Sequence, residues 1–176
     1  MVVTEDAAMT EAPRVLDVVD LKTHFFTEAG VVKAVDGVTL SVREGETLAI
    51  VGESGSGKSV TGLTVMRLLG RTSARVVGGS IRFNGRANNA LDLVALGERE
   101  MAKLRGRDIA MIFQDPMSSL NPVFTVGAQV GEAMRIHLGL SKAEARKRAI
   151  DLLKQVGISS PETRIDAYPH ELSGGM

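Results

Sequence analysis

The sequence predicts an α/β fold in which a strand, a glycine-rich loop and a helix follow one another along the chain. The segments Val15–Leu21, Val38–Val42 and Thr47–Val51 are short, rich in β-branched residues and bounded by glycine or charged residues, which is typical of strands. After the loop, Val60–Leu69 is too long and too apolar for another strand, and Gly70 follows where a helix would end. These elements predict a mixed sheet with a helix packed against it.

Further elements follow in the first two thirds of the chain. Residues 1–13 mix small and acidic side chains without periodicity, which predicts a loose N-terminal tail. Ser80–Gly85 alternates and ends in Asn-Gly, the pattern of a strand that enters a turn. Met101–Leu104 is expected to complete a short helix, and the unbroken apolar content of Asp108–Phe113 predicts a buried strand.

The last third of the chain is predicted to be helical. Val126–Leu138 places apolar residues at a spacing that gives one apolar face. Ser141–Glu144 is a capping box, in which a Ser oxygen and a Glu carboxylate each satisfy a free amide, and it opens a helix ending near Gly157. We therefore expect a mixed part over residues 14–115 and a helical part over 116–176.

Composition excludes several classes of function. Of the 176 residues 44% are apolar, which suits a globular domain, and 21 basic against 21 acidic residues give no net charge. A general nucleic-acid binder would be basic, so no nucleic-acid partner is expected. The absence of cysteine excludes disulfides, thiolate metal sites and a cysteine nucleophile. No apolar run approaches the roughly 20 residues that span a bilayer, and the first residues do not resemble a signal peptide, so we expect a cytosolic chain.

The glycine-rich loop matches the phosphate-binding pattern G-x-x-x-x-G-K-[ST]. Its residues are Gly52, Glu53, Ser54, Gly55, Ser56, Gly57, Lys58 and Ser59. Glycines let the backbone amides curl toward phosphate oxygens, and the following helix directs its positive end at the anion. Lys58 would neutralise the β- and γ-phosphates of ATP, and the Ser59 hydroxyl would hold Mg2+. The alternative is a Gly-Ser turn with an incidental lysine.

Two later segments narrow the class of nucleotide-binding protein. Gln114 follows the predicted buried strand, where its carbonyl can bind Mg2+ and its NH2 group can orient water. Leu172–Gly175 offers a hydroxyl and two glycine amides that can donate to a γ-phosphate. Taken singly, the first can be a solvated glutamine and the second a glycine-rich turn.

Together these motifs resemble the ATP-binding subunit of an ABC transporter. Gln114 lies 56 residues after Lys58, and Leu172 lies 58 residues after Gln114. The stretches Leu21–Gly37, Gln114–Pro122 and Tyr168–Met176 resemble the oligopeptide/dipeptide-permease ATPases, which include nickel importers. The resemblance implies a P-loop NTPase fold of the ABC ATPase type, with a mixed sheet, a RecA-like core and an attached helical subdomain.

The resemblance also implies roles for single residues. Gly52–Ser59 would bind the phosphates of ATP, with Lys58 catalytic and Ser59 on Mg2+. Gln114 would be the Q-loop glutamine, catalytic and a second Mg2+ ligand. The signature residues Ser173, Gly174 and Gly175 would face nucleotide held by the opposite subunit. Phe26 would stack on adenine, with Phe25 as the other candidate, although either can be a core residue.

The implied partners are transmembrane permease subunits, a second ATPase subunit that is identical or paralogous, and, indirectly, an extracytoplasmic solute-binding protein. The chain would then lie at the cytoplasmic face of the membrane as a peripheral protein. ATP and Mg2+ are the implied cofactors, and uptake of peptides or a related small solute is the implied process.

The sequence departs from the family after the signature. The family continues with an apolar strand ending in Asp-Glu, a D-loop and a switch histidine, and no such segments occur before Met176. An adjacent carboxylate polarises the attacking water in these ATPases, so the sequence predicts an N-terminal portion of an ATPase subunit that does not hydrolyse ATP alone.

Three other functions remain open at this point. A soluble ABC-type ATPase of DNA repair or chromosome organisation is disfavoured because the chain has no cysteine for a zinc site and no heptad run. A nucleoside or shikimate-type kinase would use the P-loop but would leave Gln114 and Leu172–Gly175 without a role. The chain can also be a binding-only, inactive fragment.

Overall fold

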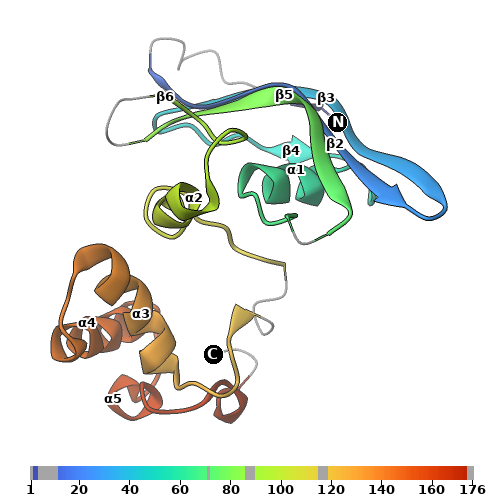
Figure 1. Ribbon diagram of the computed structural model, residues 1–176. Coiled ribbons are helices and arrows are strands. Elements are labelled where there is room, and N and C mark those ends of the chain that lie inside the picture. Colours follow the sequence, from blue (N-terminus) through green and yellow to red (C-terminus); the bar gives the residue numbers. More distant parts are fainter. Residues whose placement is uncertain (1, 4–11, 71, 86–89, 115–118, 174–176) are drawn as a thin grey trace. The chain divides into compact units, whose positions relative to one another are not determined.

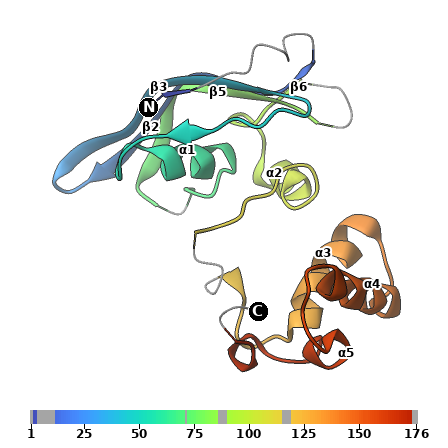
Figure 2. The same cartoon turned by 180° about the vertical axis from the view of Figure 1, so that it is seen from behind.

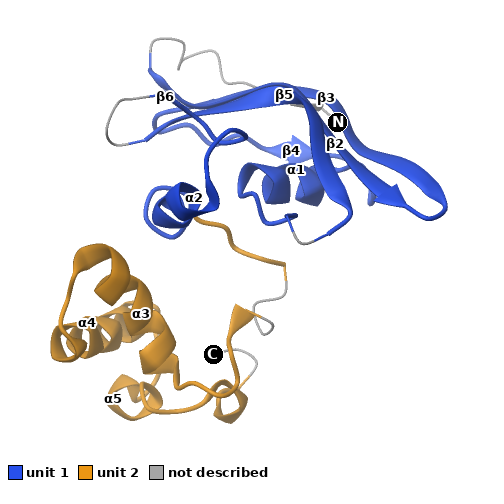
Figure 3. Cartoon of the chain, in the orientation of Figure 1, with its two compact units in different colours: residues 1–109 blue, residues 110–176 orange. Residues whose placement is uncertain are grey.

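The computed structural model describes residues 2–3, 12–70, 72–85, 90–114 and 119–173 (Figures 1 and 2). The chain divides into two compact units, residues 1–109 and 110–176 (Figure 3). The division falls between Ile109 and Ala110, a few residues before the boundary at 115 that the sequence suggested.

An antiparallel sheet forms the framework of unit 1 (Figure 1). It contains β2 (Arg14–Thr27), β3 (Gly30–Arg43), β5 (Ala74–Asn84) and β6 (Ala90–Asp92) in the order β3-β2-β5-β6. The predicted strands 15–21 and 38–42 lie inside β2 and β3, which continue to a hairpin where Thr27 pairs with Gly30. Strands β2 and β3 are longer than predicted because hydrogen bonds to a neighbouring strand also hold residues that lack a strong apolar pattern.

The described part of unit 1 also contains a two-stranded sheet. Here β1 (Val2–Val3) pairs antiparallel with β4 (Ile50–Val51). The predicted strand Thr47–Val51 is therefore shortened to its last two residues. Two residues of the predicted N-terminal tail take part in this pairing, and residues 4–11 of the tail lie outside the described part.

Helix α1 (Lys58–Val65) covers one face of the sheet in unit 1 (Figures 1 and 2). Its buried Thr64 hydroxyl shares a hydrogen bond of 3.1 Å with the hydroxyl of Thr23 on β2. The core beside it is apolar and is built around Val18, Leu21, Val35, Leu40, Ile81, Phe83, Leu93 and Met101. The helix ends earlier than the predicted Leu69, because Arg67 has a left-handed backbone (φ 52°) that a helix does not continue through.

Arg105 links the C-terminal end of α1 to α2 (Glu98–Leu104) through hydrogen bonds. The Arg105 side chain donates to the carbonyl oxygens of Met66 at 2.9 Å and Arg67 at 3.1 Å, which no longer have helical partners. It also donates to the carboxylate of Glu98 at 2.5 Å. This hydrogen bond, with the positive charge, holds the pKa of Glu98 below its usual value.

The predicted buried strand Asp108–Phe113 is wrong. Apart from one isolated bridge between Ile109 and Arg105, the described part of this segment forms no sheet. Ile112 is 95% exposed and Phe113 is 45% exposed. A strand needs neighbours for its backbone groups, and no described strand pairs with residues 110–113, so the apolar content alone does not produce one.

Unit 2 is helical, as predicted. It contains α3 (Val126–Leu138), α4 (Lys142–Gln155), α5 (Pro161–Arg164) and the short 3-10 helix η3 (Pro169–Glu171). The predicted capping box is confirmed, because Ser141 and Glu144 exchange side-chain to backbone hydrogen bonds of 2.8 and 3.3 Å. Those bonds also lower the pKa of Glu144.

Helices α3 and α4 lie side by side in unit 2 (Figure 2). Met134, Ala145, Ala149 and Ile165 are buried together. A salt bridge joins α4 to the segment after α5, because Arg146 donates to both carboxylate oxygens of Asp166 at 2.5 and 2.7 Å. This bidentate contact lowers the pKa of Asp166.

Two glycines of α3 give a matched test of this packing. A Cβ on Gly127 would lie 2.6 Å from the backbone oxygen of Ile165, whereas a Cβ on Gly131 would make an ordinary 3.5 Å contact with Ala145. We expect Gly127→Ala to lower the free energy of unfolding by about 1–3 kcal/mol through overpacking. Gly131→Ala should raise it by up to about 1 kcal/mol, because alanine favours a helix interior over glycine.

The measurement is urea unfolding followed by far-ultraviolet circular dichroism. If Gly127→Ala is as stable as Gly131→Ala, the close packing of α3 on Ile165 is wrong.

Candidate nucleotide-binding site

The loop Gly52–Gly57 connects β4 directly to α1, as the sequence predicted. Gly55 and Gly57 have positive φ angles of 81° and 88°, which favour glycine. The amide of Ser56 donates to the carbonyl oxygen of Glu53 at 3.2 Å, so the loop closes on itself in a turn. Residues 52–56 are exposed, and the loop presents its backbone to solvent.

Gly57 also lies against the backbone of β3. A Cβ on Gly57 would be 2.4 Å from the carbonyl oxygen of Ala34, closer than real Cβ atoms approach. The absence of a side chain therefore allows the loop to touch β3. Only Gly57 was predicted from the motif; Ala34 was missed because a carbonyl contact leaves no signal in the side-chain pattern.

The Lys58 ammonium is held by the loop itself. Nζ donates to the carbonyl oxygens of Gly52 at 2.6 Å and Glu53 at 2.8 Å, and to the hydroxyl of Ser56 at 3.3 Å. These contacts place its positive charge within the loop whose backbone is exposed. Lys58 and the exposed Ser59 are the first two residues of α1.

The N-terminus of α1 keeps its positive electrostatic character. Its N-cap is Gly57, which has no side chain to accept from the first-turn amides, and the first turn carries no acidic residue. The free amides and the partial positive charge at a helix N-terminus attract anions. The loop, Lys58 and this helix end together can bind a polyphosphate.

Phe26 lies on β2, in the same unit as the loop. It is 48% exposed, and it pairs with Val31 on β3. Val31 precedes Ala34 by three residues, about 10 Å along an extended strand. Phe25 is half-buried and pairs with Val32 and with Ala74 on β5. Of the two aromatic candidates, Phe26 is the more exposed.

The remaining predicted site residues belong to unit 2. Gln114 is exposed at a bend, and Ser173 is exposed just after η3. The backbone before Ser173 is fixed by hydrogen bonds from Glu171 to Tyr168 and from Leu172 to Pro169, at 2.9 and 3.2 Å. Gly174 and Gly175 lie outside the described residues.

Two further properties of the described residues bear on the site. No group of three or more histidine, aspartate or glutamate side chains in the described part is arranged to hold a metal ion. None of the described helices is long and apolar enough to cross a membrane.

Comparison with known proteins shows the family to which the chain belongs. The family model described as ABC transporter matches residues 35–176. The chain therefore belongs to the ABC transporter family. This excludes the alternative that it is a nucleoside or shikimate-type kinase. The fold also matches solved ABC cassettes, including a dimer of the ATP-binding cassette MJ0796 in a post-hydrolysis state with ADP and Pi. That structure is 25% identical with a TM-score of 0.75, over 91% of this chain and 64% of the other.

Curated relatives point to one branch of the family. The dipeptide transport ATP-binding protein DppD of Escherichia coli is 50% identical over 161 residues, which is 92% of this chain and 47% of that protein. The oligopeptide transport ATP-binding protein OppD of Bacillus subtilis is 49% identical over 168 residues, covering 96% of this chain and 46% of that protein. The chain spans about half the length of these relatives.

The contact between the loop and β3 can be tested with two glycines of the loop. Gly55 and Gly57 share a positive φ, but a Cβ on Gly55 would meet nothing within 4 Å. Both Gly→Ala substitutions should cost about 1–2 kcal/mol of backbone strain. Gly57→Ala should lower the free energy of unfolding by a further 1–3 kcal/mol or so, because it also strikes Ala34.

Urea unfolding of the two variants beside the wild type measures the difference. Equal losses in Gly55→Ala and Gly57→Ala would contradict the close approach to Ala34.

Proposed function

We propose that this chain is the ATP-binding part of an ABC ATPase subunit that energises uptake of peptides or a related small solute. The observation that carries the proposal is the loop Gly52–Gly57 with Lys58 held inside it and a helix N-terminus without a capping side chain. The two relatives above, which are named as dipeptide and oligopeptide transport ATP-binding proteins, support the choice of solute.

The donor set suits the β- and γ-phosphates of ATP. Phosphate oxygens need several donors at short range, and the loop supplies exposed backbone together with the first-turn amides of α1. The Lys58 ammonium already lies beside the loop, where it donates to two carbonyl oxygens. Rotation of its side chain alone can therefore bring it to a phosphate oxygen bound at the loop. A charge-assisted bond to phosphate is stronger than its bonds to neutral carbonyls.

The metal ion is part of the proposal. Ser59 is the exposed second residue of α1, where a hydroxyl can ligate Mg2+ bound to the phosphates. Mg2+ supplies charge neutralisation to the phosphates and accepts oxygen ligands from the protein. We assign Gln114 as a second ligand and as the group that orients water, on the strength of its motif position.

The other assigned groups complete the nucleotide site. Phe26, exposed on the hairpin of β2 and β3, is the proposed stacking partner of adenine, with Phe25 as the alternative. Ser173, Gly174 and Gly175 are the proposed signature that contacts nucleotide on a second ATPase subunit. Support for that arrangement comes from the dimeric structure of the MJ0796 cassette.

The proposed partners follow from the class. They are transmembrane permease subunits, a second ATPase subunit and, through the permease, an extracytoplasmic solute-binding protein, with the chain peripheral on the cytoplasmic face of the membrane.

Removing the lysine tests the nucleotide site directly. Lys58→Ala should weaken binding of ATP with Mg2+ by about 10- to 100-fold, because a charge-assisted hydrogen bond contributes about 1.5–3 kcal/mol. Lys103→Ala, which removes an exposed lysine from α2, is the matched control and should bind as the wild type does.

Equilibrium dialysis with labelled ATP gives the affinities. Equal affinity of the wild type and Lys58→Ala would contradict the assignment of the loop.

A further inference from the structure

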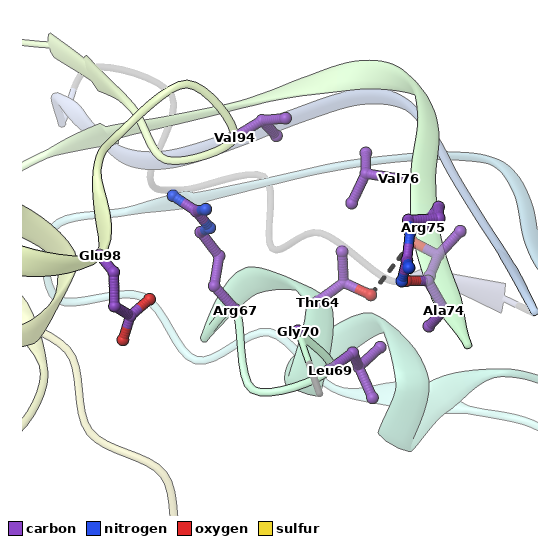
Figure 4. Close-up of a pocket in the computed structure, with 10 residues that line it drawn as sticks. Thr64, Arg67, Leu69, Gly70, Ala74, Arg75, Val76, Val94 and Glu98 are labelled. Carbon is purple, nitrogen blue, oxygen red and sulfur yellow. Dashed lines mark hydrogen bonds between the residues drawn. The ribbon is translucent and has the colours of Figure 1, made fainter. Parts of the chain in front are cut away.

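Unit 1 contains a cavity of about 370 Å³ at the C-terminal end of α1, the end opposite the phosphate-binding loop (Figure 4). Thr23 and Thr64, whose hydroxyls are hydrogen-bonded to each other, line this cavity, and the two residues are 1% and 2% exposed. Thr64 follows Lys58 by six residues, about 9 Å along a helix axis. The cavity is therefore separate from the ATP site proposed above.

Two arginines lie on either side of Thr64 in this cavity (Figure 4). Arg67 uses Nη1 to donate to the backbone oxygens of Leu93 and Leu96. These bonds hold the guanidinium in place. Arg67 is also one of the non-glycine residues with a left-handed backbone, a conformation that costs energy and is found more often at ligand sites.

Arg75 is fixed in a similar way from β5. Its Nη1 donates to the backbone oxygens of Thr72 at 3.0 Å and Ala74 at 2.7 Å. Within the part of the chain that the structure describes, the hydrogen bonds of Arg67 and Arg75 run through Nη1 only. Nε and Nη2 of each guanidinium can therefore donate to a ligand.

The charge of the cavity favours an anion. Glu98 is a lining carboxylate, but Arg105 already binds it at 2.5 Å. The lining thus carries two arginines, Arg67 and Arg75, and one carboxylate, whose pKa is lowered by Arg105 and more weakly by Arg67. Arg105 also covers the last carbonyl groups of α1, whose partial negative charge would otherwise repel an anion.

The rest of the lining is apolar. Leu69, Ala74, Val76 and Val94 come from the turn after α1, from β5 and from the connection that follows β6. Apolar walls beside a few fixed polar groups are typical of sites for small organic molecules. An inorganic ion would leave these walls against water, whereas a short aliphatic chain would cover them.

We propose that this cavity binds a small aliphatic carboxylate, with the carboxylate group between Arg67 and Arg75 and the aliphatic part against Val76 and Val94. Guanidinium groups bind carboxylates through paired hydrogen bonds, which fits the free donors of both arginines. The site is independent of the proposed ATP site and is a second binding function of unit 1.

Isovalerate and its neutral counterpart isovaleramide are the probes, titrated into the complete chain and followed by ligand-observed NMR. We expect isovalerate to bind saturably and isovaleramide at least about tenfold more weakly, since the amide lacks the charge. Arg75→Gln should weaken isovalerate binding to a similar degree. Arg82→Gln, an exposed arginine on the same strand, is the control and should change nothing.

Two further arms separate this site from the phosphate-binding loop and from misfolding. Excess ATP with Mg2+ should leave isovalerate binding unchanged. Val76→Phe, which fills the cavity without changing charge, should abolish binding while circular dichroism stays that of the wild type. The proposal is overturned if isovalerate shows no saturable binding, or if isovalerate and isovaleramide bind equally well. It is also overturned if isovalerate binds equally well to Arg75→Gln and Arg82→Gln, if ATP displaces isovalerate, or if Val76→Phe binds isovalerate as the wild type does.

Discussion

The contact between Gly57 and the backbone of Ala34 fixes the geometry of the nucleotide site. Because a methyl group at Gly57 would come within 2.4 Å of the Ala34 oxygen, the loop reaches β3 only as glycine. The same strand carries Val31, the partner of Phe26, so one stretch of β3 positions both the phosphate loop and the exposed aromatic side chain. The start of α1 is thereby set against the hairpin of β2 and β3.

Helix α1 has two ends of different character. At its start, no side chain caps the amides and no carboxylate reduces the positive end, while the Lys58 ammonium adds charge. At its other end, Arg105 binds the last carbonyl groups and Thr64 is bonded to Thr23. Side chains therefore hold the C-terminal end of α1, whereas the amides of its N-terminal end have no side-chain partner. This arrangement suits anion binding at the N-terminus.

The sequence predicted best what depends on local chemistry. The helix Val126–Leu138 and the capping box at Ser141 follow from spacing and capping, and both are confirmed. The full length of β2 and β3 was missed, and a strand at 108–113 was predicted wrongly, because a strand depends on partners elsewhere in the chain. Likewise the motif identified the loop, but the contact with Ala34 and the cavity at Arg67 arise only from tertiary packing.

The central claim, that the loop and the first turn of α1 bind ATP, is tested most directly by amide hydrogen exchange read by mass spectrometry. With saturating ATP and Mg2+, exchange should slow in peptides covering residues 53–60, because the phosphates would accept hydrogen bonds from these amides. Peptides from α4 in unit 2 should be unaffected. Bound ATP that leaves residues 53–60 exchanging at their original rate would contradict the account.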